Sequence, residues 1–359
     1  MAQRRFLVTT ILLICCLALI GCVTGIGADQ QGNPVSQINE LGQLTVSFID
    51  VGQGDSILIQ TSLGQSMLID GGERNQGEKL VEYLQKQGID QIDVMVGTHP
   101  HSDHIGGLIA VLENFQVEKI YLPKVTHSSS TFKDLLTAIK NQGLKINTAQ
   151  AGAAIPIEGV DASFIAPVRD RYDSLNNYSA VVKLVYGNIS FLFCGDAEEE
   201  SEQDILSSSR GDLKCQVLKV GHHGSSTSTS DPFLNAVKPQ YAIIMCGAGN
   251  DYGHPHQEII EKLKQAGATI YRSDENGNIV FSSDGNSLKV ENEKASTMPD
   301  KGFNQADTGE DSYYIGNKNS KKFHRLECES LPAEHNQVNL KSRAEALEAG
   351  YSPCSICQP

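Results

Sequence analysis

The stretch "THPHSDHIGG", residues 98–107, holds three of the chain's ten histidines together with one aspartate. It follows the apolar run "QIDVMVG", which is typical of a buried strand. His99 and His101 are two positions apart on extended chain and can therefore face the same way, while Asp103 and His104 begin the next turn. Imidazole and carboxylate groups are ligands for divalent metals. We therefore predict that His99 and His101 bind one ion and that Asp103 and His104 bind a second.

Apolar runs on both sides of this stretch predict the fold. Before it, "LTVSFID", "DSILIQT" and "QSMLIDGG" are aliphatic and β-branched runs separated by glycine-containing turns, as in successive strands of one sheet. After it, amphipathic helical segments alternate with apolar strands, and the Asp-Gly of "SSDGNS" indicates a closing hairpin. This order predicts an α/β sandwich of mixed sheets.

The H-x-H-x-D-H spacing resembles the signature of the metallo-β-lactamase superfamily, and the resemblance covers roughly residues 44–292. It implies an αββα sandwich and two divalent metal ions, zinc or manganese. Asp70 in "LIDGG" matches the aspartate that orients the ligands in that family. Asp196 in "FLFCGDA" matches the aspartate that bridges the two metals.

Two further histidine pairs follow predicted strands, in "LKVGHHGS" and "YGHPHQ". By order and distance, the resemblance implies that His254 completes the second metal site. Either His222 or His223 would then act with Asp103 in catalysis, by holding the substrate phosphate or by protonating the leaving group. The alternative for each pair is one core residue and one surface residue.

The sequence departs from the superfamily at the first metal. A histidine is expected between the H-x-H-x-D-H string and Asp196, but His127 comes too early. The corresponding segment, "SLNNYSAVV", offers Asn176, Asn177 and Ser179, of which we assign Asn177 a role in orienting the ligands. This departure predicts a weaker first site, or one filled by manganese rather than zinc.

Six motifs in order, "FIDVGQGDSILI", "LIDGG", "THPHSDHIGGL", "NNYSAVV", "CGD" and "LKVGHHGS", resemble the metallo-hydrolase domain of ComEC-type DNA-internalisation competence proteins. The resemblance implies hydrolysis of a phosphodiester, with DNA as the expected substrate, by hydroxide that two metals activate. No block of transmembrane helices like that of full-length members is present, so we expect any uptake machinery to be a separate partner. Three alternatives stay open: capture of DNA for such a channel, hydrolysis of an envelope phosphodiester, and hydrolysis of a lactam or thioester.

Residues 1–21 have the composition of a secretory signal, with Arg4 and Arg5 before an apolar run that is shorter than the roughly 20 residues needed to span a bilayer. The ending Leu-Ile-Gly-Cys resembles a lipobox, which implies lipidation of Cys22 and an anchor on the extracytoplasmic face of the cell membrane. Residues 22–42 are polar and predict a linker between this anchor and a hydrolase domain at 43–293.

The charge balance limits how the protein could bind nucleic acid. Without residues 1–21, the chain has 27 basic and 43 acidic residues, a formal net charge of −16. Such a surface repels DNA at long range, so tight coating of DNA is disfavoured, whereas an encounter at a local metal site is compatible with it.

The C-terminal residues predict a second, small module. Residues 294–312 have almost nothing to bury and predict a linker, and residues 313–359 carry two ligand pairs with spacing suited to one zinc ion. The pairs are His324 with Cys328, and Cys354 with Cys357. They resemble the metal-binding domain of the Ada DNA-repair proteins, with histidine in place of the first cysteine. A disulfide among these cysteines is the competing interpretation.

Overall fold

The computed structural model describes residues 42–208, 212–294, 314–325, 328, 330–340 and 343–354. The predicted signal sequence, Cys22, nearly all of both predicted linkers and Cys357 lie outside these residues.

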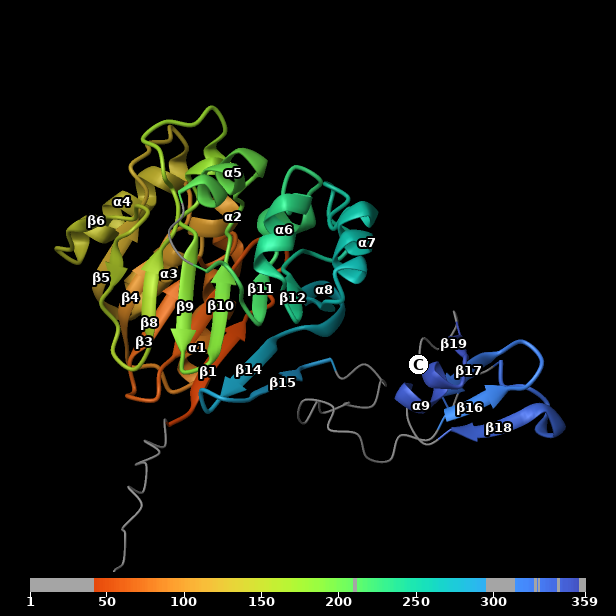
Figure 1. The fold of residues 1–359 in the computed structure, drawn as a ribbon. Helices are drawn as coiled ribbons and strands as arrows, with labels where there is room; N and C mark the ends of the chain where they lie inside the picture. Colours follow the sequence, from red (N-terminus) through yellow and green to blue (C-terminus); the bar gives the residue numbers. More distant parts are fainter. Residues whose placement is uncertain are drawn as a thin grey trace, which may run out of the picture. The chain divides into compact units, whose positions relative to one another are not determined.

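Residues 42–294 form two mixed β-sheets that pack face to face (Figure 1). The first sheet has the order β15-β14-β1-β2-β3-β4-β5-β6. Its strands are β1 (Leu44–Phe48), β2 (Ile57–Gln60), β3 (Ser66–Ile69), β4 (Gln91–Val96), β5 (Gln116–Leu122), β6 (Ile146–Thr148), β14 (Ile279–Ser283) and β15 (Leu288–Asn292). The second has the order β13-β12-β11-β10-β9-β8-β7. Its strands are β7 (Ala154–Ile155), β8 (Asp161–Phe164), β9 (Val182–Tyr186), β10 (Ile189–Phe193), β11 (Val217–Lys219), β12 (Tyr241–Ile244) and β13 (Thr269–Arg272).

Helices cover the outer face of each sheet. Those on the first sheet are α1 (Gly77–Lys86), α2 (Ser102–Ile105), α3 (Leu108–Asn114) and α4 (Ser130–Asn141), and those on the second are α5 (Glu199–Ser207), α6 (Asp231–Val237) and α7 (Gln257–Gln265), with the short α8 (Ser273–Asn276) after β13. The layers are therefore helix, sheet, sheet, helix (Figure 1). This confirms the predicted αββα sandwich.

The alternation of side chains along the strands explains why both faces of each sheet are buried. On β10, Phe191 and Phe193 point into the core between the sheets, where Phe193 meets Phe48 of β1 and Phe191 meets Phe281 of β14. Leu192, between them in sequence, packs against the outer helices instead. Because neighbouring side chains in a strand face opposite ways, such continuous apolar runs require a cover on each side.

The topology gathers the polar segments at one edge of the sandwich. β3 and β4 are parallel neighbours, as are β10 with β11 and β11 with β12. Parallel neighbours end at the same edge of a sheet, so the segments that follow these strands lie together. They carry Asp70, His99, Asp196 and His222.

A close backbone contact requires glycine at the metal-ligand loop. A Cβ built on Gly107 would lie 2.0 Å from the carbonyl oxygen of Gly71, and a Cβ on Gly54 would lie 2.1 Å from that of Asp103. Both distances are far below van der Waals contact, so only glycine allows these loops to approach so closely.

The C-terminal module contains a small sheet in the order β18-β16-β17-β19 and one helix. Its elements are β16 (Tyr314–Asn317), β17 (Lys322–Arg325), β18 (Gln337–Leu340), α9 (Arg343–Glu348) and β19 (Ser352–Pro353). The described core holds four buried side chains, Phe323, Leu340, Ala346 and Tyr351. A core of this size provides little hydrophobic stabilisation, so a metal or a covalent link is expected to support it.

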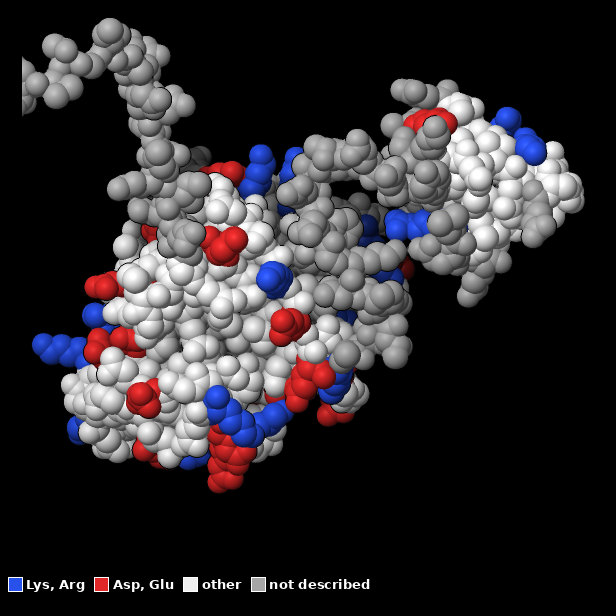
Figure 2. Space-filling view, turned by 90° about the horizontal axis from the view of Figure 1, so that it is seen from below, with Lys and Arg blue, Asp and Glu red and all other residues white. Residues whose placement is uncertain are grey.

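On the face seen in Figure 2, acidic and basic side chains are interspersed rather than separated into patches of one sign. No helix within the described ranges is long and apolar enough to cross a bilayer.

Candidate metal centre

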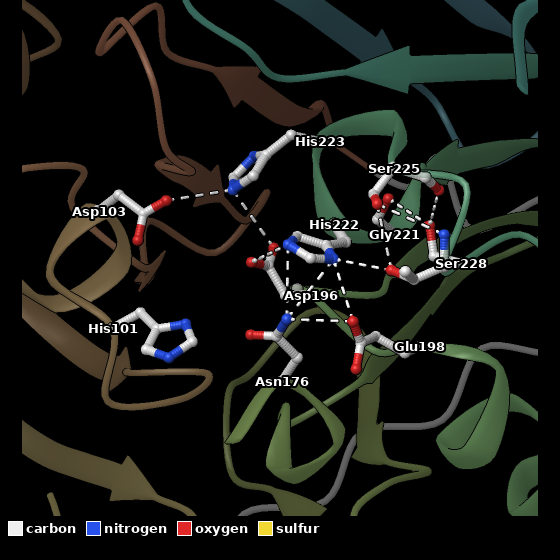
Figure 3. Close-up of polar contacts among 12 residues, drawn as sticks. His101, Asp103, Asn176, Asp196, Glu198, Gly221, His222, His223, Ser225 and Ser228 are labelled. Atoms are coloured by element: carbon white, nitrogen blue, oxygen red, sulfur yellow. Dashed lines mark hydrogen bonds and ion pairs between the residues drawn. The ribbon is translucent and has the colours of Figure 1, made fainter. Parts of the chain in front are cut away.

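Four side chains converge in a buried cluster at the polar edge of the sandwich. His104 Nε2 lies 3.2 Å from Asp196 Oδ1, and His223 Nε2 lies 3.4 Å from the same oxygen. Asp103 Oδ2 is 3.3 Å from His223 Nε2 and 3.9 Å from His104 Nε2. Figure 3 shows His223 pointing toward both Asp103 and Asp196. Two imidazoles and two carboxylates facing one another form a donor set that suits a divalent metal ion.

The hydrogen bonds around this cluster leave the facing atoms free for a metal. His104 Nε2, His223 Nε2 and Asp196 Oδ1 are buried and make no hydrogen bond. The other ring nitrogens are occupied: His104 Nδ1 is 2.8 Å from Asp70 Oδ2, and His223 Nδ1 is 2.9 Å from the carbonyl oxygen of Met245. Since a buried polar atom is costly without a partner, the residues present fit a metal ion bound at the Nε2 atoms.

The charges of the cluster support the same conclusion. Burial disfavours the charged form of both imidazoles, but neighbouring carboxylates, Asp196 foremost among them, outweigh it and raise the pKa of His104 and His223 well above the usual value. Burial raises the pKa of Asp196, yet the same imidazoles outweigh it and hold that pKa well below its usual value. The site therefore favours added positive charge, which a metal ion would supply in place of the two ring protons.

Asp70 holds the ring of His104 in place. Its carboxylate accepts hydrogen bonds from the Thr98 backbone N–H at 2.8 Å and the Thr98 hydroxyl at 2.7 Å, in addition to its contact with His104. Asp70 is fully buried and adopts a left-handed backbone with φ 58°. This geometry is that of a carboxylate that orients a metal-binding imidazole.

The remaining predicted ligands lie on the other side of Asp196. Asp196 Oδ2 is 3.6 Å from His99 Nε2, which is 3.0 Å from His101 Nδ1. Ser179 is buried beside them: its hydroxyl is 3.4 Å from His99 Nδ1 and accepts a hydrogen bond from the Asp196 backbone N–H. Of the three candidates for the missing histidine, Ser179 is therefore the one in contact with His99. These side chains could hold a first metal through the two imidazoles of His99 and His101 and the carboxylate of Asp196.

The structure gives His223 the position that the sequence predicts for His254. β11 lies next to β10, so the segment after β11 brings His223 against Asp196. His254 follows β12, one strand further away, and its ring centroid is 6.2 Å from that of His223. His254 is thus a neighbour of the cluster, and its pKa is lowered to about 4 by burial and by the nearby histidines.

We expect different effects from removing these two histidines. His223→Ala should lower the affinity for the second metal at least about tenfold, since it removes one of four ligands, whereas His254→Ala should change it less than about threefold. Titration of the metal-free protein with zinc by isothermal calorimetry measures both values. If both variants lose the same amount of zinc affinity, His254 is a ligand of the second metal after all.

His222 points toward the rim of the cluster rather than into it. Its Nε2 is 3.8 Å from Asp196 Oδ2, and 22% of its side chain is exposed. Asn176 Nδ2, Glu198 Oε1 and Thr227 Oγ1 surround the ring at 3.4, 3.4 and 3.0 Å (Figure 3). Burial raises the pKa of Glu198, but hydrogen bonds with His222, Ser174, Thr227 and Asn176 outweigh it and lower this pKa to about 2. The ring is therefore held in a fixed orientation at the mouth of the site.

Backbone strain marks the two histidines after β11. His222 and His223 have φ values of 45° and 52°, in the left-handed region that non-glycine residues rarely adopt. Two successive residues of this kind are retained only where the surrounding contacts impose them, and such positions concentrate at functional sites.

Asn177 contacts the segment that follows Asp196 rather than the candidate ligands themselves. Its side-chain oxygen accepts hydrogen bonds from the backbone N–H groups of Glu198 and Ser201, at 3.0 and 3.3 Å. It thus fixes the segment that follows Asp196 and touches none of the four clustered side chains through a described hydrogen bond.

Sequence reasoning missed a buried ion pair beneath the cluster. Lys219 on β11 is fully buried, contacts Asp55 Oδ2 and donates a hydrogen bond to the Gly195 carbonyl oxygen at 2.9 Å. Asp55 Oδ1 lies 3.4 Å from His223 Nδ1. The available signal was a charged residue inside each of two otherwise apolar or glycine-rich motifs, "GQGDSILI" and "QVLKV".

The C-terminal module carries a separate group of ligand atoms. His324, Cys328 and Cys354 are buried and each offers one ligand atom within 4.8 Å of the others. His324 Nδ1 is 3.4 Å from Cys328 Sγ, while His324 Nε2 is buried and makes no hydrogen bond. Three ligands of this type suit a tetrahedral zinc site, with Cys357, the fourth predicted ligand, outside the described residues.

Two protein families match separate parts of the chain. Residues 49–248 match the family described as Metallo-beta-lactamase superfamily. Residues 303–359 match the one described as Metal binding domain of Ada.

Individual proteins match about two thirds of the chain. ComE operon protein 3 of Bacillus subtilis is 32% identical over 253 residues, which are 66% of this chain and 32% of that protein. Competence protein ComA of Neisseria gonorrhoeae is 30% identical over 240 residues, 67% of this chain and 32% of that protein. The chain thus spans about a third of the length of these relatives. Among solved structures, the metallo-beta-lactamase fold protein YhfI from Bacillus subtilis is 12% identical with a TM-score of 0.46, covering 67% of this chain and 100% of that one.

Proposed function

The chain belongs to the metallo-β-lactamase superfamily, and on this premise we propose that it is a metal-dependent phosphodiester hydrolase that acts on DNA. The observation that carries the proposal is the buried group of His104 Nε2, His223 Nε2 and Asp196 Oδ1, which face one another without hydrogen bonds. The similarity of this chain to competence proteins supports DNA rather than a lactam or thioester as the substrate.

The residues of the site have separate roles in the proposed reaction. Asp103, His104, Asp196 and His223 would hold the second metal, and His99, His101 and Asp196 would hold the first. Metal ions bound there would lower the pKa of a coordinated water and neutralise charge on the phosphoryl oxygens. We thus propose two bound ions, each of them zinc or manganese.

His222 is the residue that we assign to the substrate. Its ring stands at the mouth of the site, is partly exposed and is fixed by Glu198, Asn176 and Thr227. From there it would donate a hydrogen bond to a phosphoryl oxygen, or a proton to the leaving oxygen. A donor that is already oriented before the substrate arrives has little reorganisation to undergo during the reaction.

The cellular setting that we propose follows the sequence. Lipidation of Cys22 would anchor the protein on the extracytoplasmic face of the cell membrane, where it would meet extracellular DNA and separate uptake machinery. In the C-terminal module, the match to the metal-binding domain of Ada and the group of His324, Cys328 and Cys354 favour structural zinc over a disulfide.

Removing and restoring metal tests the proposed function. We expect chelator-treated protein to lose hydrolysis of bis(p-nitrophenyl) phosphate and of single-stranded DNA, because the clustered ligands would then lack the ion that activates water. Zinc or manganese should restore it in proportion to the bound metal measured by mass spectrometry. A β-lactam assayed in parallel serves as the control substrate. Retention of DNA without any cleavage in the metal-loaded protein would instead support a DNA-capturing protein.

A further inference from the structure

A groove lies beside the metal centre and has no role in the reaction described above. Its volume is about 540 Å³, within the range of sites that bind small organic molecules. Its lining includes apolar and aromatic side chains, among them Leu122, Phe132, Ile146 and Tyr178. Ile146, on the exposed edge strand β6, is 46% exposed.

Two chain segments that line the groove lead to the metal centre. A smaller cavity lined by His99 and Pro100 shares Leu122 and Phe132 with the groove. The segment after β5 brings His127 to 6.3 Å from the ring of His101. In the second segment, Tyr178 immediately precedes Ser179, whose hydroxyl contacts His99. A substrate whose scissile bond lies at the metals can therefore extend into this groove.

Two cations, Lys124 and Arg171, line the groove. Lys124 and Arg171 are exposed, and within the described residues neither has an ion pair. By contrast, Arg169, two residues earlier in the sequence than Arg171, forms ion pairs with Glu200 and Asp204. Asp170 also lines the groove, so its rim carries two positive charges and one negative charge. In a chain with a formal net charge of −14, such a rim is locally complementary to an anion.

We propose that this groove binds one nucleotide of single-stranded nucleic acid next to the scissile phosphate. The base would lie against Phe132, Ile146 and Tyr178, and Lys124 and Arg171 would contact the phosphates on either side of it. Aromatic and apolar floors bind unstacked bases, whereas the bases of a duplex are covered by their neighbours. The proposal rests on the proposed function, because it extends the same substrate beyond the metals.

The test compares two pairs of substitutions in the full-length, metal-loaded protein. Lys124→Ala with Arg171→Ala removes the groove cations, and Lys133→Ala with Lys140→Ala removes two exposed cations of α4 that do not line the groove. We expect the groove variant to raise KM for a 12-nucleotide single-stranded DNA at least about tenfold and to leave KM for bis(p-nitrophenyl) phosphate within about twofold, because only DNA has flanking phosphates. The α4 variant should match the wild type on both substrates.

Binding provides a second measurement that does not need turnover. With a fluorescein-labelled 12-nucleotide DNA and metal-free protein, loss of two phosphate contacts should weaken the affinity about tenfold or more and flatten the slope of log K against log salt by about 1.4. A strand of the same length without bases should bind the wild type about tenfold more weakly, since it has nothing to stack.

The outcomes separate this inference from the proposed function. If the wild type cleaves no phosphodiester with any metal, but the groove substitutions weaken DNA binding, the proposed hydrolase function is overturned and the proposed binding of DNA in the groove stands. A wild type that cleaves DNA with a KM that the groove substitutions do not change would overturn the groove alone. Equal binding by the groove and α4 variants, or equal binding of strands with and without bases, would also overturn it.

Discussion

Replacing Asp196 with alanine should reduce metal-dependent phosphodiester hydrolysis at least about a thousandfold, the scale seen when one member of a catalytic unit is removed. Asp196 is the carboxylate that faces both sets of histidines. Its Oδ1 lies 3.2 and 3.4 Å from the Nε2 atoms of His104 and His223, and its Oδ2 lies 3.6 Å from that of His99. The substitution therefore removes a ligand from both metal positions at once.

The loss should come from the metal site and not from unfolding. Metal bound per chain, measured by mass spectrometry, should fall in step with turnover, while the melting temperature of the chelator-treated protein stays close to that of the wild type. Asp196→Asn, which keeps the size of the side chain, should behave in the same way. Asp161→Ala, at an exposed strand position, is the matched control. Turnover by Asp196→Ala at the wild-type rate would rule out a metal centre built around this carboxylate.

The sequence predicts those parts of this molecule that depend on neighbours along the chain. "LTVSFID" and "FLFC" are strands because their apolar side chains find cover on both faces, and the sandwich follows from their order. The H-x-H-x-D-H stretch is recognisable for the same local reason, since one strand end and one turn carry all four candidate ligands. The resemblance suggests roles for Asp70 and Asp196, and both lie close to strand ends: Asp70 directly follows β3, and Asp196 comes three residues after β10.

The choice between His223 and His254 depends on which strands are neighbours, which the sequence does not state. β10 pairs with β11, and β11 pairs with β12. The residue next to Asp196 must therefore come from the segment after β11, although spacing along the chain favours the segment after β12. The first metal site shows the same limit, because Ser179 reaches His99 through a contact across 80 positions of sequence.

The pair of Lys219 and Asp55 could not be predicted because a charge inside an apolar strand contradicts the usual preference for burial. It is tolerated here because each group neutralises the other. Burial disfavours both charges, yet the pKa of Asp55 is held below its usual value by Lys219, and the pKa of Lys219 is held above its usual value by Asp55. The pair also joins the segments that carry Asp103, Asp196 and His223 through hydrogen bonds and close contacts.

Replacing Lys219 with methionine should lower the free energy of unfolding by about 3–5 kcal/mol, the cost of leaving one member of a buried ion pair without its partner. Methionine has a similar length, so the loss reflects the uncompensated carboxylate of Asp55 rather than a cavity. Urea denaturation of the chelator-treated protein measures the change without a contribution from bound metal. Lys214→Met, at an exposed position just before β11, should change the free energy of unfolding by less than about 0.5 kcal/mol.

A double variant separates the charge from the shape of the side chain. Asp55→Asn combined with Lys219→Met removes both charges, so most of the lost stability should return, because the buried carboxylate that causes the loss is no longer present. Affinity for the second metal should stay below that of the wild type, since the contact of Asp55 with His223 Nδ1 loses its charge. A double variant as unstable as Lys219→Met would mean that the methionine packs poorly and that the ion pair contributes little. If stability and metal affinity both return fully, the pair only neutralises charge; if stability alone returns, it also positions the imidazole of His223 for the metal.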